Sequence, residues 1–118
     1  MSSGAPADPN FCYLTTSGRI TGRPHRVEIW FAMHSGTVYL LSGDGDRSDW
    51  VRNLMVAPDV VVEIDGRKRT TRARVVSDPA TDDLARGLLL EKYRPRYGRD
   101  LTAWGATALP VEIEWPDA

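Results

Sequence analysis

The residues best suited to chemistry lie on one loop that follows a β-favouring run. The segment Tyr13–Arg26 reads YLTTSGRITGRPHR, and it carries Arg19, Arg23 and His25 beside several hydroxyls, including that of Thr16. Arginine side chains and hydroxyls suit phosphate or carboxylate oxygens as binding partners. The loop therefore indicates an anion site, with a solvated basic turn as the alternative.

Glycine and proline give this loop its backbone character. Gly18 and Gly22 can adopt conformations that other residues resist. Pro24 fixes its own φ angle and pushes Arg23 towards an extended shape. These residues predict a defined loop between two strands.

A second glycine loop, Ser42–Ser48, leads directly into a predicted helix. Backbone N–H groups at a helix start attract anions, and Arg47 adds positive charge. Trp50 offers a surface for a flat ring, although burial is the commoner fate of tryptophan at such a position. Asn53 lies one turn further on and faces either a ligand or the sheet.

The sequence offers little for metal binding or for catalysis by a cysteine nucleophile. His25 and His34 are the only histidines, and no HxxxH or paired-cysteine spacing exists, so we expect no metal site. Cys12 precedes an apolar strand, and free cysteines in that setting are commonly buried and inert.

Length and composition restrict the class of protein. The 118 residues fit one domain, and a net charge of −1 provides no general attraction for nucleic acid. One cysteine cannot form an intramolecular disulfide, which favours a reducing cytosol. No apolar run reaches membrane-spanning length. Residues 1–10 resemble a flexible arm rather than a signal peptide, so we expect the domain to span residues 11–118.

Hydrophobic periodicity predicts a mainly β (α+β) domain. Six short strands connected mostly by hairpins favour a small antiparallel barrel, with two or three short helices at its openings or flanks. The turn Asp65-Gly66 is a strong two-residue hairpin signal. Asp78-Pro79 is a typical helix start, Tyr93–Asp100 is expected to be a connector, and Leu101–Trp104 a helical turn. The expected strands are Tyr13–Thr16, Arg26–Met33, Thr37–Leu41, Asp59–Ile64, Arg67–Val76 and Leu109–Trp115.

Taken in order, four segments resemble the deazaflavin-dependent nitroreductase family of flavin/deazaflavin oxidoreductases. They are LTTSGRITGRPH (Leu14–His25), the hairpin that ends in LLS (Leu40–Ser42), DWVRNLMVAPDVVVEI (Asp49–Ile64) and ALPVEIEW (Ala108–Trp115). The resemblance implies a split β-barrel related to the FMN-binding, pyridoxamine-phosphate-oxidase-like proteins. It also implies a homodimer and binding of coenzyme F420, an 8-hydroxy-5-deazaflavin.

The resemblance also assigns roles to individual residues. The Gly-Arg-x-x-Gly-x-Pro segment implies that Arg19, Arg23 and His25, with Pro24 beside them, contact the phosphate-containing tail of the coenzyme. Ser42 at the strand end and Trp50 before the Asn-Leu pair would lie near the deazaflavin ring. We therefore expect the coenzyme site to comprise Thr16, Arg19, Arg23, Pro24, His25, Ser42, Gly43, Arg47, Ser48, Trp50 and Asn53.

The implied activity is hydride transfer between the reduced coenzyme and a small acceptor, such as an activated alkene, a quinone or a nitro compound. The chain departs from the family in the loop between Ser42 and Trp50, which is shorter than in the nitroreductase and has Gly43 in place of the family's lysine. The family's tyrosine-rich segment is matched only loosely, by Tyr93 and Tyr97. These two tyrosines are the candidates for holding the acceptor or donating a proton. An FMN- or FAD-binding reductase and a non-catalytic carrier of the same fold remain alternatives.

Overall fold

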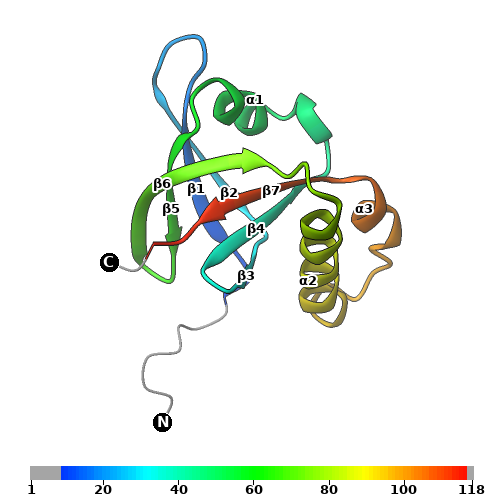
Figure 1. Ribbon diagram of the computed structural model, residues 1–118. Helices are drawn as coiled ribbons and strands as arrows, with labels where there is room; N and C mark the ends of the chain where they lie inside the picture. The colour runs from blue at the N-terminus through cyan, green and yellow to red at the C-terminus, as the bar shows by residue number, and fades with distance from the viewer. Residues whose placement is uncertain (1–8, 117–118) are drawn as a thin grey trace.

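The computed structural model describes residues 9–116, which form one curled antiparallel sheet with helices around it (Figure 1). The strand order across the sheet is β2-β1-β5-β6-β7-β4-β3. The strands are β1 (Cys12–Ser17), β2 (Pro24–Ile29), β3 (Ala32–His34), β4 (Thr37–Ser42), β5 (Asp59–Ile64), β6 (Arg67–Val75) and β7 (Leu109–Glu114). The helices are a short 3₁₀ turn, η1 (Gly45–Arg47), and α1 (Asp49–Val56), α2 (Pro79–Tyr97) and α3 (Thr102–Thr107).

The sheet curls because β6 changes partner along its length. Its first part pairs with β5 from Arg67 to Arg72, and its last part pairs with β7 from Ala73 to Val75. The two halves of the sheet therefore fold towards each other and enclose an apolar interior. Alternate residues of the strands fill that interior, as their period-2 pattern predicts. They include Leu14, Val38, Leu40, Val60, Val62, Ile64, Val111 and Ile113.

Strand β4 is buried on both faces. Val38 and Leu40 belong to the cluster inside the curled sheet, whereas Tyr39 and Leu41 pack in a second cluster with Leu89 of α2. This explains why β4 is an uninterrupted apolar run, a pattern typical of strands covered on both sides. Helix α2 thus covers part of the outer face of the sheet (Figure 1).

Two glycines are required by their surroundings. Gly66 has a φ angle of +78° and Asp65 one of +52°, which confirms the predicted two-residue hairpin between β5 and β6. Gly105 of α3 lies against Leu90 of α2, where an added Cβ would approach the Leu90 side chain to 2.7 Å. Glycine therefore allows α3 to pack closely on α2.

The prediction of one strand over Arg26–Met33 was wrong. The chain breaks at Trp30 and Phe31, so that β2 pairs with β1 and only β3 forms the predicted hairpin with β4. The physical reason lies in α2, because Trp30 stacks on Tyr93 and the Phe31 N–H donates to the Tyr93 hydroxyl at 3.0 Å. These tertiary contacts outweigh the strand propensity of the segment.

The prediction of a connector over Tyr93–Asp100 was also wrong, because α2 continues to Tyr97. Its start agrees with the sequence: Asp78 caps the helix by accepting from the Thr81 N–H at 2.9 Å. Its buried face, however, is Ala85, Leu89 and Tyr93, spaced four residues apart, which extends the helix one turn beyond the predicted apolar stripe. It ends at Gly98, whose φ angle is +72°.

The predicted arm, residues 1–10, lies mostly outside the described residues. Its last two residues are bound to α2: Lys92 donates to the Pro9 carbonyl at 3.0 Å, and the Tyr93 hydroxyl donates to the Asn10 carbonyl at 2.6 Å. The domain boundary at residue 11 stays a prediction. Over residues 9–116, no helix is both long and apolar enough to cross a membrane.

Candidate functional site

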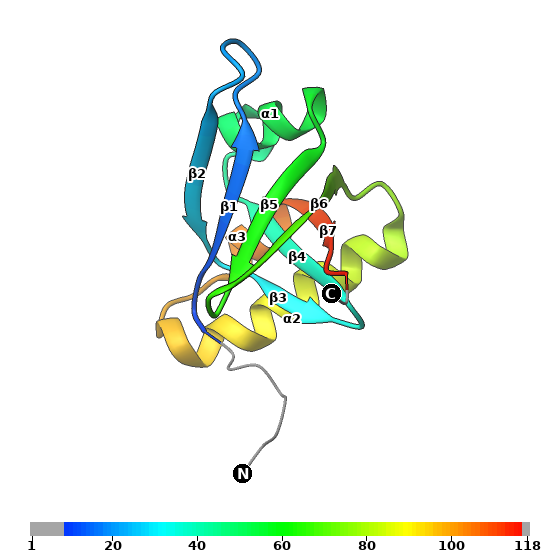
Figure 2. The same cartoon turned by 90° about the vertical axis from the view of Figure 1, so that its left-hand side faces the viewer.

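The loop between β1 and β2 projects beyond the sheet beside α1 (Figure 2). The Gly18 N–H donates to the Arg23 carbonyl at 2.8 Å, and the Gly22 N–H donates to the Gly18 carbonyl at 2.7 Å. Gly22 has a φ angle of +75°, which a side chain would disfavour. The predicted glycine loop is therefore a closed hairpin turn with a fixed backbone.

Arg19 attaches this loop to α1. Its backbone N–H and its Nη1 donate to the Asn53 Oδ1 at 3.1 and 2.9 Å, and its Nη2 lies 3.1 Å from an Asp49 carboxylate oxygen. The Arg19 guanidinium thus holds the loop on the helix instead of extending into solvent. Asp49 was not among the predicted site residues, because nothing in the sequence indicates which helix Arg19 contacts.

Asn53 is the centre of this network. It is 3% exposed, and its Nδ2 donates to the Thr16 hydroxyl at 3.1 Å while its Oδ1 accepts from Arg19. Thr16 is 1% exposed and lies within the sheet. The two side chains therefore connect β1, the loop and α1 from inside, where an unpaired polar group would be costly.

The second glycine loop is held by a pair of serines. The Ser42 hydroxyl lies 2.8 Å from the Gly45 carbonyl, to which it donates, and 2.7 Å from the Ser48 hydroxyl. Gly45 has a φ angle of +62°, which allows the tight turn into η1. Ser48 occupies the N-cap position of α1 but makes no side-chain bond to the helix backbone. Its hydroxyl fastens the loop to the end of β4 instead.

The two loops meet at the first turn of α1. Ser48, which binds Ser42, directly precedes Asp49, which binds Arg19. Residues that are thirty positions apart in the sequence are thereby brought to one helix start. This junction brings together five of the eleven residues that the sequence assigned to the coenzyme: Thr16, Arg19, Ser42, Ser48 and Asn53.

Exposed basic residues lie on or beside the two loops of this junction. Arg23, His25 and Arg47 are exposed, as is Pro24. The Arg23 guanidinium makes no ion pair with any residue between 9 and 116. An exposed cation held on a fixed backbone is well placed to bind an anionic group, since little conformational entropy is lost on binding.

Trp50 is buried, whereas Gly43 lies at the surface. Trp50 is 8% exposed and packs in the apolar interior with Val51 and Leu54, so that its ring supports α1 from within. Gly43 is exposed, and a Cβ added there would lie 3.5 Å from the Trp104 ring of α3. The aromatic surface beside the Ser42–Ser48 loop therefore comes from Trp104.

Three partly exposed rings form what we call the aromatic cluster: Trp30, Tyr97 and Trp104. The rings of Tyr97 and Trp104 meet the Trp30 ring edge-on, with centroids 5.0 and 5.5 Å away. Arg99 lies 5.6 Å above the Tyr97 ring, which itself is 45% exposed. The sequence analysis missed Trp30 and Trp104, because only the packing of α2 and α3 against the sheet brings them together.

Tyr93 does not reach this surface. It is 1% exposed, stacks beneath Trp30 and binds the backbone of Phe31 and Asn10 through its hydroxyl. We therefore expect Tyr93→Phe to lower the free energy of unfolding by about 1–3 kcal/mol, because it leaves buried backbone groups without a partner. Chemical denaturation measures that loss.

Turnover should distinguish the two tyrosines. In Tyr93→Phe the folded fraction should keep its turnover number, since the hydroxyl is closed off from an acceptor. A fall of about a hundredfold or more at unchanged stability would instead identify Tyr93 as an essential proton donor. Tyr97→Phe is the matched variant with an exposed hydroxyl.

The remaining reactive groups are not arranged for catalysis. Burial raises the pKa of the Cys12 thiol to about 12, so the thiolate that a nucleophile requires is scarce at neutral pH. In residues 9–116, no group of three or more His, Cys, Asp and Glu side chains could hold a metal ion.

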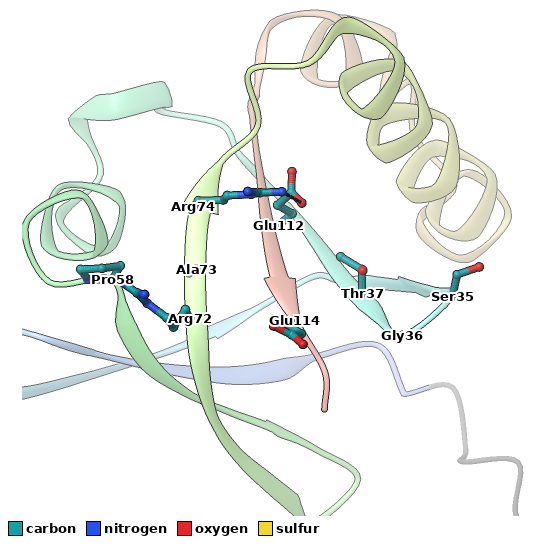
Figure 3. Close-up of a pocket in the computed structure, with 9 residues that line it drawn as sticks. All are labelled: Ser35, Gly36, Thr37, Pro58, Arg72, Ala73, Arg74, Glu112 and Glu114. Carbon is teal, nitrogen blue, oxygen red and sulfur yellow. Dashed lines mark hydrogen bonds and ion pairs between the residues drawn. The ribbon is translucent and has the colours of Figure 1, made fainter. Parts of the chain in front are cut away.

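A groove of about 620 Å³ lies elsewhere, on the outer face of β6 and β7 (Figure 3). Arg72, Arg74, Glu112 and Glu114 line it, with Thr37 at the start of β4. Ser42, at the other end of β4, belongs to the loop junction. None of its lining residues lies in the two glycine loops, and Glu112, which lies opposite Tyr39, is about 10 Å of strand from the level of Ser42.

A family comparison decides the class of this protein. The model of the F420H2-dependent quinone reductase family matches residues 4–116, nearly the whole chain. The chain belongs to this family. The reductase is therefore an F420-dependent oxidoreductase, which confirms the enzyme class and the coenzyme that the resemblance implied. Curated protein sequences give no significant match.

Solved structures confirm the split-barrel fold of the reductase. An F420-H2 dependent reductase, FDR-A, superposes with a TM-score of 0.73 at 20% identity, over 95% of this chain and all of that one. A structure described as a domain-swapped dimer gives 0.73 at 20% identity, covering 92% and 81% of the two chains. A putative pyridoxamine 5'-phosphate oxidase from Listeria innocua gives 0.65 at 16% identity, covering 89% and 82%.

The residues at the loop junction fit coenzyme F420. Its tail carries negative charge, and the exposed cations Arg23 and Arg47 lie on the two loops that meet there. Its tricyclic ring is flat, and the aromatic cluster lies beside Gly43 at the end of the second loop. Which of these residues touch the coenzyme remains a prediction.

Proposed function

We propose that this F420-dependent reductase acts on small planar acceptors, with quinones ahead of nitro compounds and activated alkenes. The observation that carries the proposal is the aromatic cluster beside Gly43. Trp104 lies next to that residue, the Trp30 ring contacts Trp104, and the Tyr97 ring contacts Trp30. Flat, partly exposed rings favour a flat ligand through offset or edge contacts.

In this proposal, each part of the junction has its own role. Arg23, His25 and Arg47 bind the anionic tail, while Arg19 and Asn53 hold the first loop in the position that presents them. Ser42 and Ser48 fix the second loop, and Gly43 keeps the space between that loop and Trp104 open. When bound, the coenzyme supplies the hydride, and the protein supplies position and electrostatics.

The acceptor also needs a proton, and we propose that solvent provides it. Tyr93 is buried, whereas Tyr97 is 45% exposed, so water reaches an acceptor that is held beside Tyr97. Tyr97 then positions the acceptor. Arg99 above its ring places a positive charge where a reduced acceptor would gain negative charge.

The test is oxidation of reduced F420 by 1,4-naphthoquinone, a nitroaromatic compound and an activated alkene. We expect the quinone to give the highest kcat/KM. Trp104→Leu should raise the KM for the quinone roughly two- to tenfold with little change in kcat, as expected for loss of an aromatic contact. Trp115→Leu, on β7's far end, is the matched control. Equal kcat/KM for all three acceptors, or an unchanged KM in Trp104→Leu, would contradict the proposal.

Two further expectations accompany this function. We propose a homodimer, supported by the likeness to a structure described as a domain-swapped dimer. The cytoplasmic location predicted from the single cysteine also stays a proposal. Binding of coenzyme without turnover of any acceptor would favour the alternative of a carrier protein.

A further inference from the structure

The groove of Figure 3 carries two rows of opposite charge. Arg72 and Arg74 stand on β6, and Glu112 and Glu114 stand on the neighbouring strand β7. Arg74 lies opposite Glu112 in the ladder, and their side chains form an ion pair of 3.0 Å. If the pairing of β6 with β7 is extended beyond Ala73 and Ile113, the next two residues that lie opposite each other are Arg72 and Glu114.

These charges are incompletely satisfied within one chain. Glu114 is exposed and makes no ion pair with any residue of the described range 9–116. The Arg74 side chain is 77% exposed although it contacts Glu112, and Arg72 is 74% exposed beside Asp59, which lies 3.5 Å away. Four charges on one uncovered sheet face, arranged as two parallel rows, point to a partner with the complementary arrangement.

The same surface of a second copy has that arrangement. Consider a two-fold axis that runs parallel to the strands, above the line between β6 and β7 and midway between two copies. Rotation about this axis does not move a residue along the strand direction, so each residue faces the partner's strand at the same height. It places the arginine row of each copy over the glutamate row of the other, so that the partner's Arg72 faces Glu114 and the partner's Arg74 faces Glu112. Such a self-complementary patch is what a symmetric dimer interface requires.

We propose that the β6–β7 groove is a homodimer interface held by reciprocal arginine–glutamate pairs. The hollow bordered by Ser35, Thr37 and Pro58 takes up the long side chains of the second copy (Figure 3). None of the residues that line the groove belongs to the two coenzyme loops, so the interface leaves those loops accessible.

The test is charge reversal followed by mixing, with mass measured by sedimentation. The wild-type chain is expected to be dimeric, with a Kd that rises with salt. Both Arg72→Glu/Arg74→Glu and Glu112→Arg/Glu114→Arg should be monomeric, with the homodimer Kd raised about a hundredfold or more, because like charges then face each other. An equimolar mixture of the two should form a heterodimer. Arg67→Glu/Lys68→Glu reverses two charges on β6 outside the groove and should stay dimeric.

Reversal inside one chain also places like charges on neighbouring strands, so thermal unfolding is recorded for every variant. If a double variant does not fold, Arg72→Glu and Glu114→Arg are compared and mixed in the same way, because the axis makes them facing residues. A monomeric wild-type chain, reversed variants that remain dimeric, or folded variants whose mixture stays monomeric would each overturn the interface. None of these results depends on coenzyme binding, so they leave the reductase function to its own tests.

Discussion

Replacing Asn53 with leucine is expected to weaken coenzyme F420 binding by more than tenfold and to destabilise the fold at the same time. Asn53 is buried, and it pairs with the Thr16 hydroxyl and with both the backbone and the guanidinium of Arg19. Leucine has a similar volume but no polar atoms. It would remove the acceptor of the Arg19 N–H groups and the donor to the Thr16 hydroxyl, and it would release the loop from α1.

The expected loss in the free energy of unfolding is about 2–3 kcal/mol, because each unsatisfied buried group costs about 1–3 kcal/mol. Urea denaturation measures this loss, and fluorescence titration with F420 below the transition measures the affinity of the folded protein. Met55→Ala, an exposed position on the same helix, is the control and should change neither value by much. Intact affinity in folded Asn53→Leu would show that the loop needs no anchor on α1.

Replacing Arg23 with alanine is expected to lower F420 affinity by roughly tenfold or more without affecting stability. The Arg23 guanidinium has no ion-pair partner in residues 9–116, and a charge-assisted hydrogen bond to phosphate or carboxylate is worth about 1.5–3 kcal/mol. The loss should shrink as salt is added, because the site is exposed.

Arg19→Ala provides the contrasting case. Its guanidinium is bound to Asn53 and Asp49, so the variant acts through the position of the loop, and its loss of affinity should depend less on salt. Arg67→Ala, at the opposite end of the sheet, controls for net charge. If neither arginine variant in the loop alters the affinity for F420, the loop is a solvated basic turn and not an anion site.

Local signals in the sequence predicted the elements whose contacts are local. The Asp65-Gly66 hairpin, the Asp78 cap and the alternation of Val60, Val62 and Ile64 all match the structure, because each depends on neighbouring residues. The fold class followed from these strands together with the family resemblance, and the structural neighbours confirm it.

Elements that depend on distant partners could not be predicted in the same way. The break at Trp30 and Phe31 exists because Tyr93, sixty residues later, binds that backbone. Helix α2 passes through Pro95 because Tyr93 and Leu89 are buried against the sheet. Local propensity favoured one strand over Arg26–Met33 and a connector over Tyr93–Asp100. Tertiary contacts instead break the strand and continue the helix.

The same distinction between local and distant contacts applies to the residues of the candidate site. Residue types and glycine spacing identified both loops, but they did not indicate that Arg19 and Thr16 are joined through Asn53. Trp50 is buried, which is the commoner of the two fates considered for it. Of the aromatic cluster only Tyr97 was predicted, since Trp30 and Trp104 share no motif and meet only after α3 packs near Gly43.

Competitive binding of F420 and FMN tests the central claim most directly. Each is titrated into the purified protein and followed by its own fluorescence, and any ligand that purifies with the protein is identified by its mass and visible spectrum. The loop junction and the family both predict that F420 binds at least tenfold more tightly than FMN, and that Arg23→Ala removes much of this preference. Clearly tighter binding of FMN would contradict the account.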